Sequence, residues 1–249
     1  MLNKKLISLL RIFKHIFKIQ KIKLIFIFFK YIFFKEKIIN WKFDKSTVHQ
    51  ITSLRSFSRI KYAHQKEPLT QKWINNMSSG SVFWDVGANV GIFTFLAAQK
   101  NLKVVAFEPL YSNFFNLSKT LENNINLYKK VIVLPFALDS SFKISKFLSK
   151  STSAGYSGGQ FDNIILSEDE DIKKSKIVSI NDKYLNMILP DEFKSPQYIK
   201  IDVDGNDFRI LQNLEKNLIG NKIISLMIES EDRATQEKII NYLLRFDMH

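Results

Sequence analysis

The stretch that decides the fold is Val82-Phe83-Trp84-Asp85-Val86-Gly87-Ala88-Asn89-Val90-Gly91, which leads into an apolar run over residues 92–98. β-Branched and aromatic residues precede a Gly-X-Asn-X-Gly turn, and helical periodicity follows it, so the pattern predicts a strand, a tight turn and a helix. Gly87 and Gly91 lack a Cβ, which allows unusual dihedral angles and close approach of a ligand. The N-terminus of such a helix favours a carboxylate or phosphate. The stretch therefore predicts a ligand-binding corner.

The corner departs from the dinucleotide fingerprint G-x-G-x-x-G at one position. Asn89 stands where that fingerprint has the second glycine, whose absent side chain lets the backbone close on a pyrophosphate. A pyrophosphate cofactor such as NAD is therefore disfavoured. A nucleoside cofactor with an amino-acid tail, such as S-adenosylmethionine, fits better. The alternative is an ordinary glycine turn that binds nothing.

A second strand supports the cofactor interpretation. Lys103 is followed by the apolar residues 104–107, which lead to Glu108 and Pro109, and Glu108 lies 23 residues after Asp85. A carboxylate at the end of the second strand of a βαβ unit is placed to accept hydrogen bonds from both ribose hydroxyls. Proline ends the strand there because it has no N–H for the ladder. The alternative is that Glu108 is a solvated loop acid.

Composition indicates one globular α/β domain with an extension. The chain has 249 residues, 45% of them hydrophobic and 24% charged, which are ordinary globular values. It has no cysteine, which excludes disulfides, thiolate zinc sites and a cysteine nucleophile. The net charge is +13, but residues 1–43 contain eleven Lys or Arg and one acid, so +10 of it lies there and +3 in the rest. The basic character that suggests an anionic partner therefore belongs to the N-terminal arm alone.

Residues 1–43 are predicted to form a basic amphipathic helical arm. Over residues 1–37 the cationic side chains fall on one helix face and the apolar side chains on the other, as in helices that lie in a membrane interface. The apolar run 24–34 is interrupted by Lys30 and is shorter than the about 20 residues that span a bilayer. We predict peripheral contact of residues 1–37 with an anionic inner membrane face, and a cytoplasmic location. The alternatives are packing on the following domain and contact with RNA.

The arm is followed by a predicted helical connector over residues 44–79 and a domain over residues 80–249. In the connector, Pro68 marks a helix start, and the connector is placed to cover the cofactor or substrate mouth. Beyond the second strand we predict a helix over 112–127 and a third strand over 130–136.

Three features follow the third strand. Ala137 and Leu138 are placed at its carboxyl end, where an adenine could pack. Residues 142–148 and 164–166 alternate weakly and suggest a hairpin. The glycine-rich segment 151–160 is either a solvent linker or a lid over the acceptor.

The rest of the chain alternates strands with helices, which predicts a doubly wound, mostly parallel sheet with helices on both faces. Strands are expected over 177–182, 198–201 and 222–229, and helices after Asn181 and over 208–218 and 233–246. Ligands of such sheets bind at the carboxyl ends of the strands. Five carboxylates occupy those ends and predict a site there, namely Asp85, Glu108, Asp202, Asp204 and Glu229.

Taken together, the motifs resemble those of the FkbM family of S-adenosylmethionine-dependent methyltransferases. They are Asp85 to Gly91, Phe107-Glu108-Pro109, Lys200-Ile201-Asp202-Val203-Asp204-Gly205 with Ile210-Leu211, and Met227-Ile228-Glu229. The match covers about residues 80–245 in the right order. It implies a class I methyltransferase (Rossmann-like) fold and O-methylation of a hydroxyl on a sugar, glycan or related metabolite.

The resemblance also assigns residues to the cofactor and to the reaction centre. Asp85 to Asn89 would hold the methionine end of the cofactor and Glu108 its ribose, while Lys200, Asp202 and Asp204 would line the reaction centre. The predicted cofactor-binding set is Asp85, Gly87, Ala88, Asn89, Gly91, Glu108, Pro109, Ala137 and Leu138. Asp204 stands where many family members have glutamate. The family fold should also add two strands after the last helix, so we expect either a truncated chain or an exposed edge strand at residues 223–228 that must be covered.

Methyl transfer to an alcohol requires removal of its proton as the new bond forms. No histidine lies in the core motifs, so we predict a carboxylate base, with Asp202 as first choice, Asp204 second, and Lys200 orienting or polarising. The alternative is that Asp202 only caps the following helix. A metal held by these aspartates with Glu229 is a weaker alternative, because strand-end carboxylates also serve as caps and hydrogen-bond hubs, and we assign no metal.

Three rival functions stay open. RNA methylation is motivated by the basic arm, but the chain has no cysteine, no Asn-Pro-Pro or Asp-Pro-Pro, and a nearly neutral body, so nucleic acid is not an expected partner. A membrane-tethered, degenerate methyltransferase fold acting as an interaction module is the non-enzymatic rival. An NAD-dependent oxidoreductase is third. The expected partner is a carbohydrate or small-molecule hydroxyl acceptor, which the sequence does not identify further.

Overall fold

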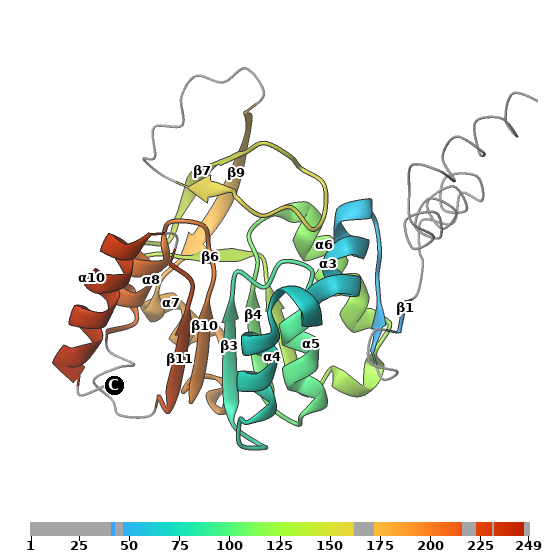
Figure 1. Ribbon diagram of the computed structural model, residues 1–249, viewed down its shortest axis with the longest axis horizontal. Coiled ribbons are helices and arrows are strands. Elements are labelled where there is room, and N and C mark those ends of the chain that lie inside the picture. Colours follow the sequence, from blue (N-terminus) through green and yellow to red (C-terminus); the bar gives the residue numbers. More distant parts are fainter. Residues whose placement is uncertain (1–40, 43–46, 162–171, 216–222, 231, 247–249) are drawn as a thin grey trace, which may run out of the picture. The chain divides into compact units, whose positions relative to one another are not determined.

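The computed structural model (Figure 1) describes residues 41–42, 47–161, 172–215, 223–230 and 232–246. The chain divides into two units, residues 1–40 and 41–249, and every described residue belongs to the second unit. Apart from Trp41 and Lys42, the predicted arm lies outside the described residues, so its helix and its membrane contact stay predictions. Within the described ranges, no helix is both long enough and apolar enough to cross a membrane.

A five-stranded parallel sheet forms the centre of the described structure. Its strands, in spatial order, are β11 (Ser225–Ile228), β10 (Tyr198–Ile201), β3 (Val82–Val86), β4 (Lys103–Phe107) and β5 (Val131–Leu134). The first strand of this sheet along the chain, β3, lies in its middle. β4 and β5 then extend the sheet to one edge, and β10 and β11 extend it to the other. The predicted doubly wound parallel sheet is confirmed. The strand order reverses between β3 and β10, and ligands of such sheets bind at this switch point.

Helices cover both faces of the sheet because side chains alternate along each strand. On β3, Phe83 packs with one set of helices and Trp84 with the other. The first set is α4 (Pro68–Asn75), α5 (Ile92–Gln99), α6 (Tyr111–Glu122) and the 3₁₀ turn η1 (Ile125–Leu127). The second set is α7 (Asp182–Ile188), η2 (Asp191–Phe193), α8 (Asp207–Asn213), α10 (Arg233–Leu243) and η3 (Leu244–Phe246). The indole N–H of Trp84 donates to the carbonyl of Phe193 at 3.0 Å, which ties β3 to η2.

A second, four-stranded sheet adds a ladder that the sequence did not predict. It consists of β6 (Phe136–Leu138), β9 (Lys173–Ile180), β7 (Lys143–Ser149) and β8 (Gln160–Phe161), in that order. β7 pairs antiparallel with β8 and with β9, so only part of the hairpin predicted between residues 142–148 and 164–166 can be compared, and the ladder with β9 was not predicted. Residues 164–166 lie outside the described residues. The long ladder with β9 brings Phe147 and Ile177 into a small core.

The strand predicted over residues 130–136 is two strands in two sheets. β5 ends at Leu134 in the central sheet, and β6 begins at Phe136 in the second one. Pro135 between them has no N–H to donate, so neither ladder continues through it. After β6, the buried carboxylate of Asp139 forms an ion pair with Arg209 of α8 at 2.7 Å, which ties the end of β6 to this helix.

The segment before the central sheet contains two helices and a short ladder. β1 (Trp41–Lys42) pairs with β2 (Val48–His49), and α3 (Leu54–Lys66) follows. The capping box of Ser53 and Ser56 begins α3, and α4 begins at Pro68, where a helix start was predicted. α3 buries one face that includes Phe57 and Ile60. Side chains on the opposite face of α3 therefore point away from this buried contact.

Candidate active site

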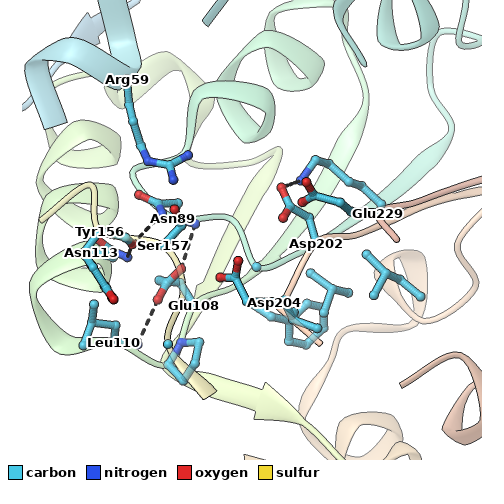
Figure 2. Close-up of a pocket in the computed structure, with 18 of the residues that line it drawn as sticks. Arg59, Asn89, Glu108, Leu110, Asn113, Tyr156, Ser157, Asp202, Asp204 and Glu229 are labelled. Atoms are coloured by element: carbon cyan, nitrogen blue, oxygen red, sulfur yellow. Dashed lines mark hydrogen bonds and ion pairs between the residues drawn. The ribbon is translucent and has the colours of Figure 1, made fainter. Parts of the chain in front are cut away.

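A cavity of about 810 Å³ lies at the carboxyl ends of β3, β4, β10 and β11. α3, the start of α4 and the loop over residues 155–159 complete its wall. Nine of the predicted site residues line it: Gly87, Asn89, Glu108, Pro109, Ala137, Leu138, Lys200, Asp202 and Asp204. Figure 2 shows the carboxylates of Glu108, Asp204, Asp202 and Glu229 around this space.

Three predicted cofactor residues do not line the cavity. Asp85 is buried behind it, where its Oδ2 accepts a hydrogen bond from the hydroxyl of Thr94 at 2.6 Å. Burial raises the pKa of Asp85. Ala88 packs into the core beside α5. A Cβ on Gly91, whose φ is +84°, would lie 2.3 Å from a methyl of Leu117, so this glycine allows helix packing and not ligand approach.

The N-terminus of α5 was predicted to offer its N–H groups to a ligand, and the structure does not bring it to the cavity. Val90 is fully buried, and the N–H of Gly91 donates to the carbonyl of Ala88 at 2.9 Å. Neither residue lines the cavity. The turn brings only Gly87 and Asn89 to the cavity wall.

Gly87 allows the ends of β3 and β10 to lie in close contact. Its φ is +83°, and a Cβ placed on it would lie 1.9 Å from the carbonyl oxygen of Asp202. The glycine thereby lets the turn after β3 pass directly against the turn after β10. This contact holds the predicted cofactor corner and the predicted reaction centre in one wall.

Glu108 is a buried carboxylate held by backbone N–H groups. Its Oε2 accepts a hydrogen bond from the backbone N–H of Asn89, and its Oε1 accepts one from the N–H of Leu110, both at 2.8 Å. Asn89 adopts a φ of +53°, which directs its N–H to this carboxylate. Burial outweighs these hydrogen bonds, and a further one from the Asn113 side chain, and raises the pKa of Glu108 to about 7. The carboxylate can still accept from a ligand donor on its remaining lone pairs.

Lys200 and Asp202 form a buried ion pair at the end of β10. Lys200 lies beside Asp85 in the register of β10 with β3, and its Nζ contacts Asp202 Oδ2 at 2.5 Å. Burial acts to lower the pKa of Lys200, but the carboxylates of Asp202 and Asp85 outweigh it, so the pKa is raised. Burial likewise acts to raise the pKa of Asp202, and the Lys200 ammonium outweighs it, so the pKa is lowered. Both groups are therefore charged near neutral pH.

Glu229, directly after β11, is the partner of Asp202 that sequence reasoning left out of the catalytic set. The two side chains lie together in Figure 2 and share a hydrogen bond. That hydrogen bond and the charge of Asp202 raise the pKa of Glu229 to about 8. Its position at a strand end was visible in the sequence, but the pairing was not, because β10 and β11 meet only in the folded sheet.

The turn between β10 and α8 is held by Asp207, which the sequence analysis missed. Its two carboxylate oxygens accept from the N–H groups of Val203 at 3.0 Å and Gly205 at 3.2 Å. Burial raises the pKa of Asp207 to about 6. The N-cap of α8 is Asn206, so the alternative that Asp202 caps this helix is wrong. An aspartate in the first turn of a helix after a Gly-containing acidic turn is the local signal that could have identified Asp207.

The glycine-rich loop over residues 151–160 belongs to the cavity wall. Side chains from other segments hold its backbone, among them these: Asn89 Nδ2 donates to Tyr156 O at 2.9 Å, Asn113 Oδ1 accepts from Gly155 N at 2.7 Å, and Asp204 Oδ2 accepts from Gly158 N at 2.6 Å. Of the two interpretations of this segment, the solvent linker is therefore wrong. The side chains of Asn89 and Asp204 are committed to holding the loop.

The segment before the family-like motifs supplies further cavity residues that no local pattern marked. They are Arg55, Ser58 and Arg59 of α3, its last residue Lys66, and Glu67 to Thr70. Part of the predicted connector therefore belongs to the cavity wall. Among the residues that the structure describes, no group of three or more His, Asp or Glu side chains has the arrangement of a metal site.

The chain is similar to known methyltransferases. The family model of the methyltransferase FkbM domain matches residues 85–247. A curated relative, hexuronic acid methyltransferase AglP from Haloferax volcanii, is 23% identical over 173 residues, which cover 68% of this chain and 64% of that protein. The chain thus spans a little less than two thirds of the length of this relative.

Two solved structures are also similar. Precorrin-6Y C5,15-methyltransferase from Geobacter metallireducens is 12% identical with a TM-score of 0.42. The alignment covers 74% of this chain and 71% of that one. The C-terminal domain of precorrin-6Y C5,15-methyltransferase from Rhodobacter capsulatus is 11% identical with a TM-score of 0.43. The alignment covers 82% of this chain and 78% of that one. The family match covers well over half of the chain and includes the end of β3 and all of β4, β10 and β11, with their strand-end carboxylates. This protein belongs to the FkbM methyltransferase domain family, as the resemblance of its motifs predicted.

Proposed function

We propose that the protein is an S-adenosylmethionine-dependent O-methyltransferase that acts on a hydroxyl of a sugar, a glycan or a related metabolite. Family membership supports methyl transfer, and the name of the AglP relative makes a sugar acid the first acceptor to test. The single observation that carries the proposal is Glu108, a buried carboxylate held by two backbone N–H groups at the end of β4 and facing the cavity.

The cavity residues fit the proposed cofactor. Its volume of about 810 Å³ falls in the range of small-molecule sites. Pro109, Leu110, Ala137 and Leu138 form an apolar wall next to Glu108, suited to an adenine, while Glu108 is suited to ribose hydroxyls. The chemistry supplied by such a cofactor is transfer of a methyl group from sulfonium sulfur to the acceptor oxygen, and the electron pair of the broken C–S bond stays on sulfur.

We assign removal of the acceptor proton to the Asp202–Glu229 pair. Lys200 stabilises the negative charge of Asp202, and Asp202 in turn makes Glu229 the more basic carboxylate. The acceptor hydroxyl gives its proton to the ionised pair as its oxygen bonds to the methyl carbon. Asp204, the second choice from sequence, is better suited to positioning the loop, because its carboxylate accepts from the N–H of Gly158. Lys200 keeps its predicted role of orienting and polarising.

Isothermal titration with S-adenosylhomocysteine, the demethylated product, tests the cofactor assignment. Ribose hydroxyls donate to the ionised form of Glu108, so the affinity should fall about tenfold per pH unit below about pH 7 and be constant above it. Glu108→Gln should weaken binding about 10- to 100-fold at pH 8 and remove this pH dependence. Glu122→Gln, an exposed residue of α6, is the control and should bind as the wild type does. A folded wild-type protein that binds neither S-adenosylmethionine nor its product would refute the proposal and favour the interaction module.

We further propose that residues 1–37 bind an anionic membrane at its cytoplasmic face. The support is their basic amphipathic sequence. Deleting residues 1–37 should greatly reduce sedimentation with anionic liposomes, and high salt should reduce that of the full chain. Unchanged sedimentation after the deletion would contradict this proposal and leave the assignment of the cavity untouched.

A further inference from the structure

Arg59 is a cation of the cavity wall that the proposed reaction does not use. Its half-buried side chain extends from α3 into the cavity, as Figure 2 shows. Its Nε donates to the carbonyl of Gly155 at 2.6 Å, which fixes the plane of the guanidinium. Within the described part of the chain, no carboxylate forms an ion pair with Arg59 and no acceptor bonds its two terminal nitrogens. A guanidinium whose terminal N–H groups are free is suited to bind a carboxylate.

The proposed cofactor brings a carboxylate that the glycine corner does not neutralise. The N-terminus of α5 is the expected anion site, but Val90 is buried and Gly91 does not line the cavity. Lys200, the buried cation of the site, is engaged by Asp202. A carboxylate at the aminoacyl end of the cofactor therefore needs another cation.

The order of contacts along the cavity places Arg59 at that end. Leu110 of the apolar wall donates to Glu108, Glu108 accepts from the N–H of Asn89, and the Asn89 side chain donates to Tyr156. The residue before Tyr156 is Gly155, which accepts from Arg59. In Figure 2, Leu110, Glu108, Asn89 and Arg59 follow one another along one side, and Asp202 and Glu229 lie opposite. Adenine, ribose and aminoacyl group follow one another in the same order in S-adenosylmethionine.

We infer that Arg59 binds the carboxylate of the aminoacyl end of the cofactor, an inference that rests on the proposed function. α3 lies before residue 85, where the family match begins, so a segment outside the matched domain would complete the cofactor site. Arg55, one turn earlier, is the nearest alternative, but it is exposed and lies over the Tyr156 ring, 5.2 Å from its centroid. Lys66 is exposed at the end of α3. Arg59 is the better placed of these three cations.

The test compares two ligands that differ in the aminoacyl group. S-Adenosylhomocysteine has the carboxylate, whereas 5′-methylthioadenosine keeps the adenine, the ribose and the thioether without it. In the full-length protein at pH 8, Arg59→Gln should weaken binding of S-adenosylhomocysteine about 10- to 100-fold and leave that of 5′-methylthioadenosine unchanged. Arg59→Lys should fall between wild type and Arg59→Gln. Lys61→Gln is the matched control, because it removes a cation of α3 that does not line the cavity, and it should bind both ligands as the wild type does.

The other outcomes separate this inference from the proposed function. Equal loss for both ligands would mean that Arg59 acts by holding the loop at Gly155, and would overturn the inference. Unchanged binding of both, with a raised KM for an acidic sugar, would assign Arg59 to the carboxylate of the acceptor and overturn it too. If the wild type binds neither ligand, the proposed function itself fails. Binding is measured because the charge of Arg59 also acts on the carboxylates of Asp202 and Asp204, so a change in rate alone would be ambiguous.

Discussion

The Glu229→Gln variant is expected to lose about 10²- to 10⁴-fold in kcat for methyl transfer while it binds S-adenosylhomocysteine as tightly as the wild type. Glutamine can still donate a hydrogen bond to Asp202, so the local contact survives, but it cannot accept a proton. Asp202 alone is a weak base because Lys200 stabilises its ionised form. The carboxylate of Glu229 has its pKa raised to about 8 and is the stronger base.

The pH profile provides the independent check. The base must be ionised, so kcat of the wild type should rise with pH and level off above about pH 8, where Glu229 has lost its proton. The variant should lack this rise. Glu237→Gln, an exposed substitution on α10, should keep both the rate and the profile. A Glu229→Gln enzyme with the wild-type rate and the same rise near pH 8 would assign the base to another group.

Gly87→Ala is expected to destabilise the protein by about 2–5 kcal/mol, the sum of a left-handed backbone penalty and a steric clash. The φ of Gly87 is +83°, and the new Cβ would lie 1.9 Å from the backbone oxygen of Asp202. Because that neighbour is backbone, relief requires the turns after β3 and β10 to separate. Such a loss is a large part of the roughly 5–15 kcal/mol that stabilises a typical domain, so we expect a much lower urea midpoint or an insoluble protein.

Gly80→Ala is the matched control, since it separates the two contributions. Gly80 has nearly the same φ, +82°, but a methyl group added to it would have nothing within 4 Å. The free energy of unfolding of this variant should fall only by the backbone penalty, about 1–2 kcal/mol. Equal urea midpoints for the two variants would show that the turns after β3 and β10 move apart at no cost, and would contradict the contact described above.

The central sheet could be predicted because its signals are local. β3 and β4 have the predicted bounds, since apolar runs that end at Gly87 and Pro109 specify their own limits. The alternation of strands and helices then selects the doubly wound order. The second sheet could not be predicted in the same way. The pairing of β7 with β9 joins residues that are far apart in sequence, and weak alternation does not choose among such partners.

The site, like the fold, was predictable only where its signals are local. Asp85, Glu108, Asp202, Asp204 and Glu229 could be placed at strand ends from the sequence, because parallel strands end at one edge of the sheet. The sequence could not show that Asp85 lies behind the cavity, that Asp202 pairs with both Lys200 and Glu229, or that Arg59 reaches the cavity from α3. Those facts depend on which strands are neighbours and on which way each side chain points.

The amino-acid sequence thus sufficed for the family, the parallel α/β sheet and the edge at which the acids gather, because spacing and periodicity act within one strand or one turn. Only the tertiary structure decided which acid faces the cavity, which carboxylates share a proton and which cation of α3 reaches the cavity wall. The pKa of Glu108 is raised by burial and that of Glu229 by its bond to Asp202 and the charge there, and both effects arise only when distant segments pack together.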